Sequence, residues 1–151
     1  MKSKISYTGR IRVTTRHSDG RVEVEEFDNL ITDLGLDLLR DYLDGDETDG
    51  KLDYMAVGTG AVAPANGDTA LGSEQFRKAV TLQTKGTTGR LTTTTYLSPA
   101  ECVFHIKELG WFVQATDTPG SGVLIARVLY DKDKTNLESI QVDRVDAFER
   151  G

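Results

Sequence analysis

The chain begins with two segments in which apolar and polar residues alternate. Apolar side chains or glycine occupy every second position over residues 5–13, which is the period of a half-buried strand. Residues 18–20, Ser-Asp-Gly, are typical of a turn, and alternation resumes over residues 21–27 with Val22 and Val24 on one side. The pattern predicts a β-hairpin at the start of the chain.

The hairpin has one basic and one acidic strand. Arg10, Arg12 and Arg16 lie on the first strand, and Glu23 and Glu25 lie on the second. A two-residue loop would place Arg16 opposite Glu23, so that the basic stripe faces an acidic one across the ladder. We therefore interpret the stripe as a solvated face neutralised by its partner strand, and alternatively as a contact surface for a neighbouring protein.

The period changes after Phe27, where a leucine-rich segment predicts one amphipathic helix near residues 32–43. Thr32 is the expected N-cap and Gly45 the expected stop. We expect the helix to lie across one side of a sheet and to bury its apolar face. That face consists of Leu34, Leu38, Leu39, Tyr42 and Leu43.

Short strands separated by Gly and Pro turns fill the rest of the chain. Residues 58–72 lack a period and predict a surface loop, and a short helical turn is expected over residues 73–77. The expected strands are 79–84, 91–97, 102–107, 111–115 and 123–130. The last of these is almost continuously apolar, which predicts a central strand. The fold class is mostly β: an antiparallel β-sandwich, jelly-roll-like, with one helix.

The 151 residues have the length and composition of one folded domain. Residues 1–17 are either an N-terminal arm that reaches a neighbour or the first strand of the hairpin, and residues 143–151 are expected to form a C-terminal tail. The opening residues lack the apolar run of a signal peptide, and no segment has the eighteen consecutive apolar residues of a membrane span. The only cysteine, Cys102, cannot form an intramolecular disulfide.

Charge is unevenly distributed along the chain. Residues 1–17 carry +5, residues 18–50 carry −10, and the remainder carries −1, which gives the net charge of −6. Phosphate contacts require a cationic surface, so we expect no direct nucleic-acid partner. The basic first segment is better suited to an acidic segment of another protein.

Three patterns resemble chemical sites and fail on spacing. Counted from Asp44, the acidic loop lacks the glycine and the closing glutamate of a calcium loop. The Gly-Thr-Gly sequence at residues 58–60 lacks the lysine of a phosphate-binding loop. Cys102 and His105 would point to opposite faces of a strand. We predict no enzyme activity, no cofactor and no metal site.

Three charged residues are predicted to hold loops, and one aromatic residue is a candidate contact. Glu74 and Arg77 would pair on the expected helical turn. Glu108 precedes a Leu-Gly pair that suggests a tight turn, and a buried carboxylate there would bind backbone amides or an arginine. Trp111 and Phe112 are neighbours on a strand, so we expect one in the core and the other exposed as a contact surface.

The order of several motifs resembles that of small structural proteins of tailed bacteriophages, found with tail, baseplate and fibre components. The resemblance spans about residues 22–130. It is carried by Asn29-Leu-Ile-Thr, Met55-Ala-Val-Gly-Thr-Gly60, Ala63-Pro64, Asp68-Thr69-x-Leu71-x-x-Glu74-x-x-Arg77 and Ile106-x-Glu108-Leu-Gly-Trp111. It implies a virion β-sandwich that forms homo-oligomers, with a trimer as our expectation. The chain lacks the coiled-coil or collagen-like stretch of a complete tail fibre.

The expected function is therefore that of a structural component of a tailed-phage virion, made in the host cytoplasm and acting by contacts with itself and with other virion proteins. A capsid decoration protein is an alternative that relies on the same kind of contact. A second alternative is a carbohydrate-binding module that recognises a surface glycan, in which Trp111, Tyr54 or Tyr96 would stack on a sugar ring.

Overall fold

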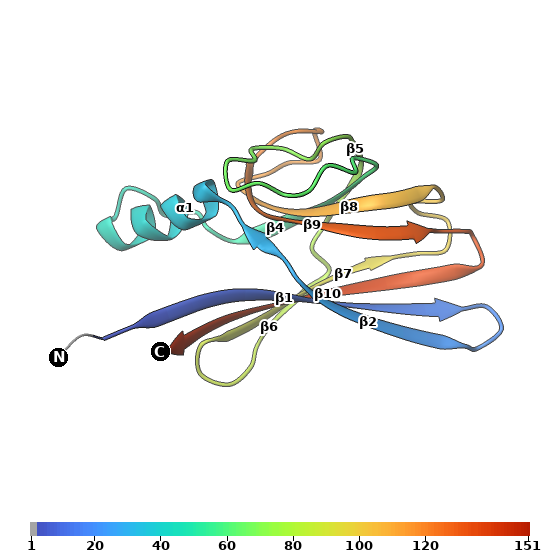
Figure 1. Cartoon of the computed structure of the whole chain (residues 1–151), viewed down its shortest axis with the longest axis horizontal. Coiled ribbons are helices and arrows are strands. Elements are labelled where there is room, and N and C mark those ends of the chain that lie inside the picture. Colours follow the sequence, from blue (N-terminus) through green and yellow to red (C-terminus); the bar gives the residue numbers. More distant parts are fainter. Residues whose placement is uncertain (1–2) are drawn as a thin grey trace.

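Two five-stranded antiparallel sheets form the protein (Figure 1). The structure is a computed structural model that describes residues 3–151. In spatial order, sheet A consists of β2 (Val22–Asp28), β1 (Ile5–His17), β10 (Glu138–Arg150), β7 (Arg90–Leu97) and β6 (Leu82–Lys85). Sheet B consists of β3 (Leu30–Ile31), β9 (Val123–Asp133), β8 (His105–Val113), β4 (Leu52–Gly58) and β5 (Glu74–Ala79).

The main core lies between the two sheets. Ile11 and Val142 of sheet A face Trp111 and Ile106 of sheet B in one buried cluster, and all four side chains are almost inaccessible to solvent. The predicted antiparallel β-sandwich with one helix is confirmed. Its jelly-roll-like character stays a prediction. The strand over residues 123–130 is confirmed as an interior strand of sheet B, because β9 lies between β3 and β8.

The opening hairpin forms with a register that differs by one residue from the predicted register. The loop has three residues, 18–20, because the His17 amide donates to the Arg21 carbonyl (2.9 Å) and Gly20 has the positive φ of 90° that ends such a loop. Arg16 therefore pairs with Val22, while Glu23 lies opposite Thr15. A one-residue shift moves every side chain to the other face.

β1 is an interior strand of sheet A along much of its length. It pairs with β10 from Ile5 to His17 and with β2 from Arg10 to Arg16. The segment considered as an arm, residues 1–17, is thus part of the sheet from Ile5 onward, and its first two residues lie outside the described residues. Residues 143–150 belong to β10, between β1 and β7, where we had expected a tail. Deleting residues 1–17 would remove β1, the strand that pairs with β2 on one side and with β10 on the other.

The single helix, α1 (Asp33–Asp44), begins and ends as predicted. The Thr32 hydroxyl accepts a hydrogen bond from the Gly35 amide (3.0 Å) and donates to the Leu124 carbonyl (2.7 Å), which fixes the helix start to β9. Gly45 ends the helix in the left-handed conformation, φ 85°.

The helix does not bury the predicted leucine face. Leu34 and Tyr42 are exposed and Leu43 is 92% exposed, whereas Leu38 and Leu39 are half-buried. The reason is the position of α1, which projects from one end of the sandwich and does not cross a sheet (Figure 1). Its contact with β9 depends on Gly35, the one buried residue of the helix.

The Gly35→Ala substitution is expected to destabilise the protein, although alanine favours helices over glycine. A Cβ atom at this position would lie 2.6 Å from the carbonyl oxygen of Ile125. We expect a loss of about 2 kcal/mol in the free energy of unfolding, measured by chemical denaturation. Gly67→Ala is the matched control, because a Cβ atom there meets nothing within 4 Å. Equal stabilities of the two variants would contradict this account of the helix contact.

Candidate functional site

The outer face of sheet B is covered by two loops, and the first of these is held by Glu108. This side chain on β8 is completely buried. Its carboxylate accepts hydrogen bonds from the backbone amides of Gly60 (2.9 Å), Gly72 (2.9 Å) and Ser73 (2.7 Å). These amides lie at the two ends of the loop over residues 59–73, so one carboxylate closes the loop onto the sheet.

Arg127 of β9 completes this clamp. Its Nε atom donates to Glu108 Oε2 (2.8 Å), its Nη2 atom forms an ion pair with the same oxygen (2.8 Å), and its side chain is only 3% exposed. The same guanidinium binds the Asp68 carboxylate (3.1 Å) and the Val62 carbonyl (2.8 Å). The loop is therefore fixed at its ends by Glu108 and at its middle by Arg127. No pattern in the sequence identified Arg127, since its partners are 19 to 65 residues distant.

Glu108 is ionised because its hydrogen bonds outweigh its burial. Burial alone would raise the pKa of this carboxyl group, but the amides of Ser73 and Gly72 and the Arg127 guanidinium lower the pKa below its ordinary value. Leu109 and Gly110, where we expected a tight turn, continue β8 as a strand. Glycine at residue 110 allows close packing, because a Cβ atom there would lie 2.6 Å from a methyl group of Leu71.

Glu74 and Arg77 form the second tie, on a strand and not on the predicted helical turn. Two hydrogen bonds, of 2.8 and 2.9 Å, join the carboxylate to the guanidinium. Positions i and i+3 normally point to opposite faces of a strand. Here the pairing of β5 with β4 skips Gln75, since Gly58 pairs with Glu74 and Val57 with Phe76. This bulge brings the two charges to the same face.

Arg77 holds the second loop, residues 114–122, on the outer face of sheet B. Its Nη1 atom donates to the Thr116 carbonyl (3.0 Å) and to the carbonyl and hydroxyl of Ser121 (3.0 and 2.8 Å). The guanidinium also lies 4.7 Å from the centre of the Phe112 ring. Both predicted tie residues are thus committed to loop anchoring.

Trp111 is not a contact residue, because it is fully buried between the sheets. The expectation that its neighbour Phe112 would then be exposed is also wrong. Phe112 points to the outer face of sheet B, but the two clamped loops cover it. There it forms a second core cluster with Ala56, Leu71 and Leu124. Periodicity places the two rings on opposite faces correctly, but it cannot show that both faces are covered.

A third buried cation lies in the main core and has no signature in the sequence. Arg144 of β10 is inaccessible to solvent and donates to both carboxylate oxygens of Asp146 and to the Tyr7 hydroxyl. The Tyr7 hydroxyl in turn donates to Asp146 (2.6 Å), and Trp111 stacks over the guanidinium at 5.3 Å. Burial raises the pKa of Tyr7, so this hydroxyl remains protonated. The cluster joins β1 and β10 of sheet A to β8 of sheet B.

The outer face of sheet A is open. By register, the predicted contact residues Arg10, Arg12 and Arg16 all point to this face, and all three are exposed. Arg10 binds Glu26 and Asp28. Four exposed apolar side chains share the face: Val22, Val24, Leu82 and Tyr96.

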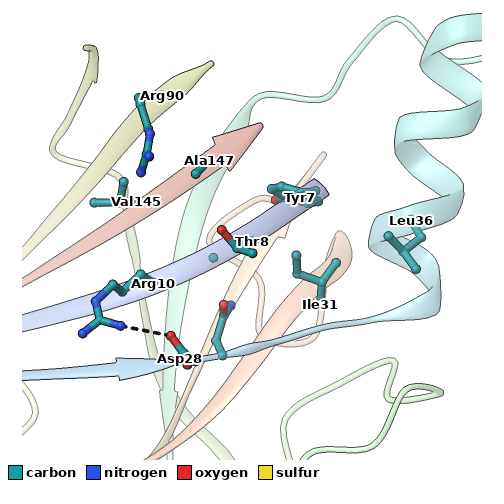
Figure 2. A pocket seen from close by; sticks show the side chains of 11 residues that line it. Tyr7, Thr8, Arg10, Asp28, Ile31, Leu36, Arg90, Val145 and Ala147 are labelled. Carbon is teal, nitrogen blue, oxygen red and sulfur yellow. Dashed lines mark hydrogen bonds and ion pairs between the residues drawn. The ribbon is translucent and has the colours of Figure 1, made fainter. Parts of the chain in front are cut away.

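A groove lies between β1 and the segment that leads into α1 (Figure 2). Its volume is about 640 Å³. Tyr7 and Thr8 of β1 form one wall, and Ile31 and Leu36 form the opposite wall. Arg10 and Asp28 pair at its outer rim.

The structure gives a packing role to the cysteine and to the glycine motif considered in the sequence. Burial raises the pKa of the Cys102 thiol to about 12, so the nucleophilic thiolate is scarce at neutral pH. Among residues 3–151, no group of three or more His, Cys, Asp or Glu side chains is placed to bind a metal ion. No helix in that range is long and apolar enough to span a membrane. Gly58 and Gly60 pack against Glu108 and the loop that it holds.

The fold and its clamped loops define a β-sandwich with one covered face and one open face. Comparison of the chain with protein-family models, with curated proteins and with solved structures gave no match.

Replacing Glu108 with glutamine is expected to lower the free energy of unfolding by about 3 kcal/mol. Arg127 would remain buried without the Glu108 carboxylate, and the new side-chain amide would direct an N–H group at backbone N–H groups. Chemical denaturation measures the change. Asp117→Asn, at an exposed position of the other loop, is the control and should be close to wild type. A Glu108→Gln protein as stable as this control would show that the clamp does not stabilise the fold.

The same carboxylate predicts an acid-sensitive stability. The pKa of Glu108 is lower in the folded chain than its ordinary value of 4.5, so protonation favours the unfolded chain. Its contribution is complete above pH 4.5 and is lost as the pH falls through the folded pKa. Denaturation midpoints measured from pH 7 to pH 2.5 should fall less steeply below pH 4.5 in Glu108→Gln than in wild type. Parallel curves would contradict the prediction.

Proposed function

We propose that this chain is a structural module of a tailed-phage virion, in the tail, baseplate or a fibre-associated position, and that it acts through self-assembly and contacts with other virion proteins. The observation that carries the proposal is the difference between the two outer faces. Sheet B is closed by two loops, each fixed by a buried arginine. Sheet A leaves apolar side chains exposed among arginines, a composition suited to a protein interface.

The motifs that carry the resemblance support the proposal through their structural roles. Asp68, Glu74, Arg77 and Glu108 are the charged residues of these motifs that anchor the two loops. Trp111 fills the core. Conserving such residues would preserve a scaffold and its closed face, while the open face remains free to differ between proteins that occupy different positions in a particle.

Of the two alternatives, the capsid decoration protein depends on the same open face and stays an alternative. The carbohydrate-binding alternative has little support in the side chains proposed for it. Trp111 is buried, and Tyr54 packs in the second core cluster beside Arg77. Tyr96 alone of the three is exposed, and it lies on the outer face of sheet A.

The test is the presence of the chain in particles. Antibodies against the protein are expected to label purified tailed virions of the phage that encodes it, on the tail or baseplate. Labelling of the head would favour the decoration alternative, and unlabelled virions would contradict the proposal.

Incorporation should depend on the outer face of sheet A. Val24→Glu places a charge among the exposed apolar side chains of that face and is expected to reduce incorporation into particles at least tenfold, measured by immunoblot of purified virions. Val62→Glu is the matched control, because Val62 is equally apolar and 77% exposed but lies in the loop that covers sheet B. Equal incorporation of both variants would exclude this face as the contact. Unchanged melting temperatures of both purified variants would exclude misfolding as the cause.

A further inference from the structure

One end of β1 has an unpaired edge. β10 pairs with β1 from Ile5 onward, whereas β2 pairs with it only from Arg10 onward. Alternate residues of an antiparallel strand direct both main-chain groups to the same neighbour. His17 and Gly9 direct theirs toward the side of β2, as their hydrogen bonds with Arg21 and Asn29 show. Ile5 and Tyr7 therefore direct their amide and carbonyl groups to the free edge.

An apolar groove follows this edge. The wall opposite Tyr7 consists of Ile31 and Leu36, and the Leu36 side chain is 51% exposed. A strand added beside β1 would place every second side chain between β1 and α1 (Figures 1 and 2). The groove thus combines main-chain hydrogen-bonding groups with an apolar wall, the two requirements for binding an extended segment. Ile5, at the end of the same edge, is an apolar side chain that is 78% exposed.

In two copies of the chain, the free main-chain groups of Ile5 and Tyr7 can pair with each other across this edge. Charge favours a register with the two-fold axis at Ser6 over one with the axis at Tyr7. With Ser6 on a two-fold axis, Ile5 lies opposite the partner's Tyr7, and Lys4 lies opposite the partner's Thr8. If Tyr7 lay on the axis, Lys4 would face the partner's Arg10, and like charges in that arrangement are unfavourable. Ile5 would then also face the partner's Gly9, whose carbonyl already accepts from Asn29 in the same chain.

We infer that this protein dimerises by antiparallel pairing of β1 with β1 of a second copy, about a two-fold axis at Ser6. The main-chain groups of Ile5 and Tyr7 are then paired, and Ile5 of each copy enters the partner's groove beside Leu36. The two A sheets become one continuous sheet. The inference deepens the proposed function, on which it rests, by naming the contact between copies. Such a contact makes dimers, so the expected trimer would need a further interface.

Cysteine cross-linking tests the axis. Facing residues in a non-hydrogen-bonded antiparallel pair have Cα atoms about 4.5 Å apart, within the range of a disulfide. Ser6→Cys should therefore form a covalent dimer under mild oxidation, seen on a non-reducing gel. Thr84→Cys is the matched control, exposed on β6 at the opposite edge of the same sheet. The native Cys102 is buried in both variants. A Ser6→Cys protein that cross-links no more than Thr84→Cys would overturn the inference.

A charge series tests the register. Thr8→Lys creates two Lys–Lys pairs across the axis and is expected to raise the dimer dissociation constant about tenfold. Thr8→Glu creates two Glu–Lys pairs and should lower it. Adding Lys4→Glu to Thr8→Lys should restore dimerisation, which a merely destabilising substitution at Thr8 would not allow. Light scattering over a concentration series measures the constant. The same constant in all variants would overturn the register.

The failures of this inference and of the proposed function are distinguishable. A wild-type protein that is monomeric at all concentrations, yet labels virions, would overturn the edge contact alone. A cross-linked Ser6→Cys dimer of a protein that is absent from virions would overturn the proposed function alone.

Discussion

The buried ion pair between Glu108 and Arg127 is the interaction on which the asymmetry of this molecule depends. A long loop over a sheet face leaves backbone amides that need partners. One carboxylate accepts from three of them, and the arginine that neutralises it binds the middle of the same loop. Desolvating both charges costs free energy, which the surrounding hydrogen bonds offset. The result is a closed face with its own small apolar core beneath it.

The protein uses buried arginines in three places, each with a different task. Arg127 and Arg77 fix loops on sheet B, and Arg144 joins sheet A to the indole of Trp111. The planar guanidinium suits these tasks because its donors bind a carboxylate and carbonyl groups at the same time. Among residues 3–151 no such loop covers sheet A, so its outer face and the edge of β1 remain accessible. Rigidity on one side and accessibility on the other fit the proposed role in assembly.

The sequence predicts those features that depend on neighbouring residues. Alternation found the opening hairpin, β7 and β9, and the capping residues Thr32 and Gly45 placed the helix ends. It missed β5, which was expected as a helical turn, and it divided β8 into two strands at 102–107 and 111–115. The hairpin register was wrong because the loop has three residues and not the expected two, and a change of one loop residue shifts the register. Gly110 resembled a turn residue, although it lies within a strand and allows close packing. Glu108 could be recognised as a candidate tie by its position, whereas Arg127 could not. Its role arises from contacts between strands and loops far apart in the sequence.

The pairing of β1 with β10 has a consequence for the order of events during synthesis. All strands of sheet B lie within residues 30–133, whereas sheet A also needs strands from before and after that range. β1 is synthesised before β10, so sheet A cannot close around β1 until residues 138–150 have been added. Such long-range pairing makes folding slow. Until residues 138–150 are made, β1 lacks its long partner strand and the core face of sheet B is incompletely covered. An incomplete chain therefore exposes a strand edge and apolar surface, a hazard that ends only when β10 pairs.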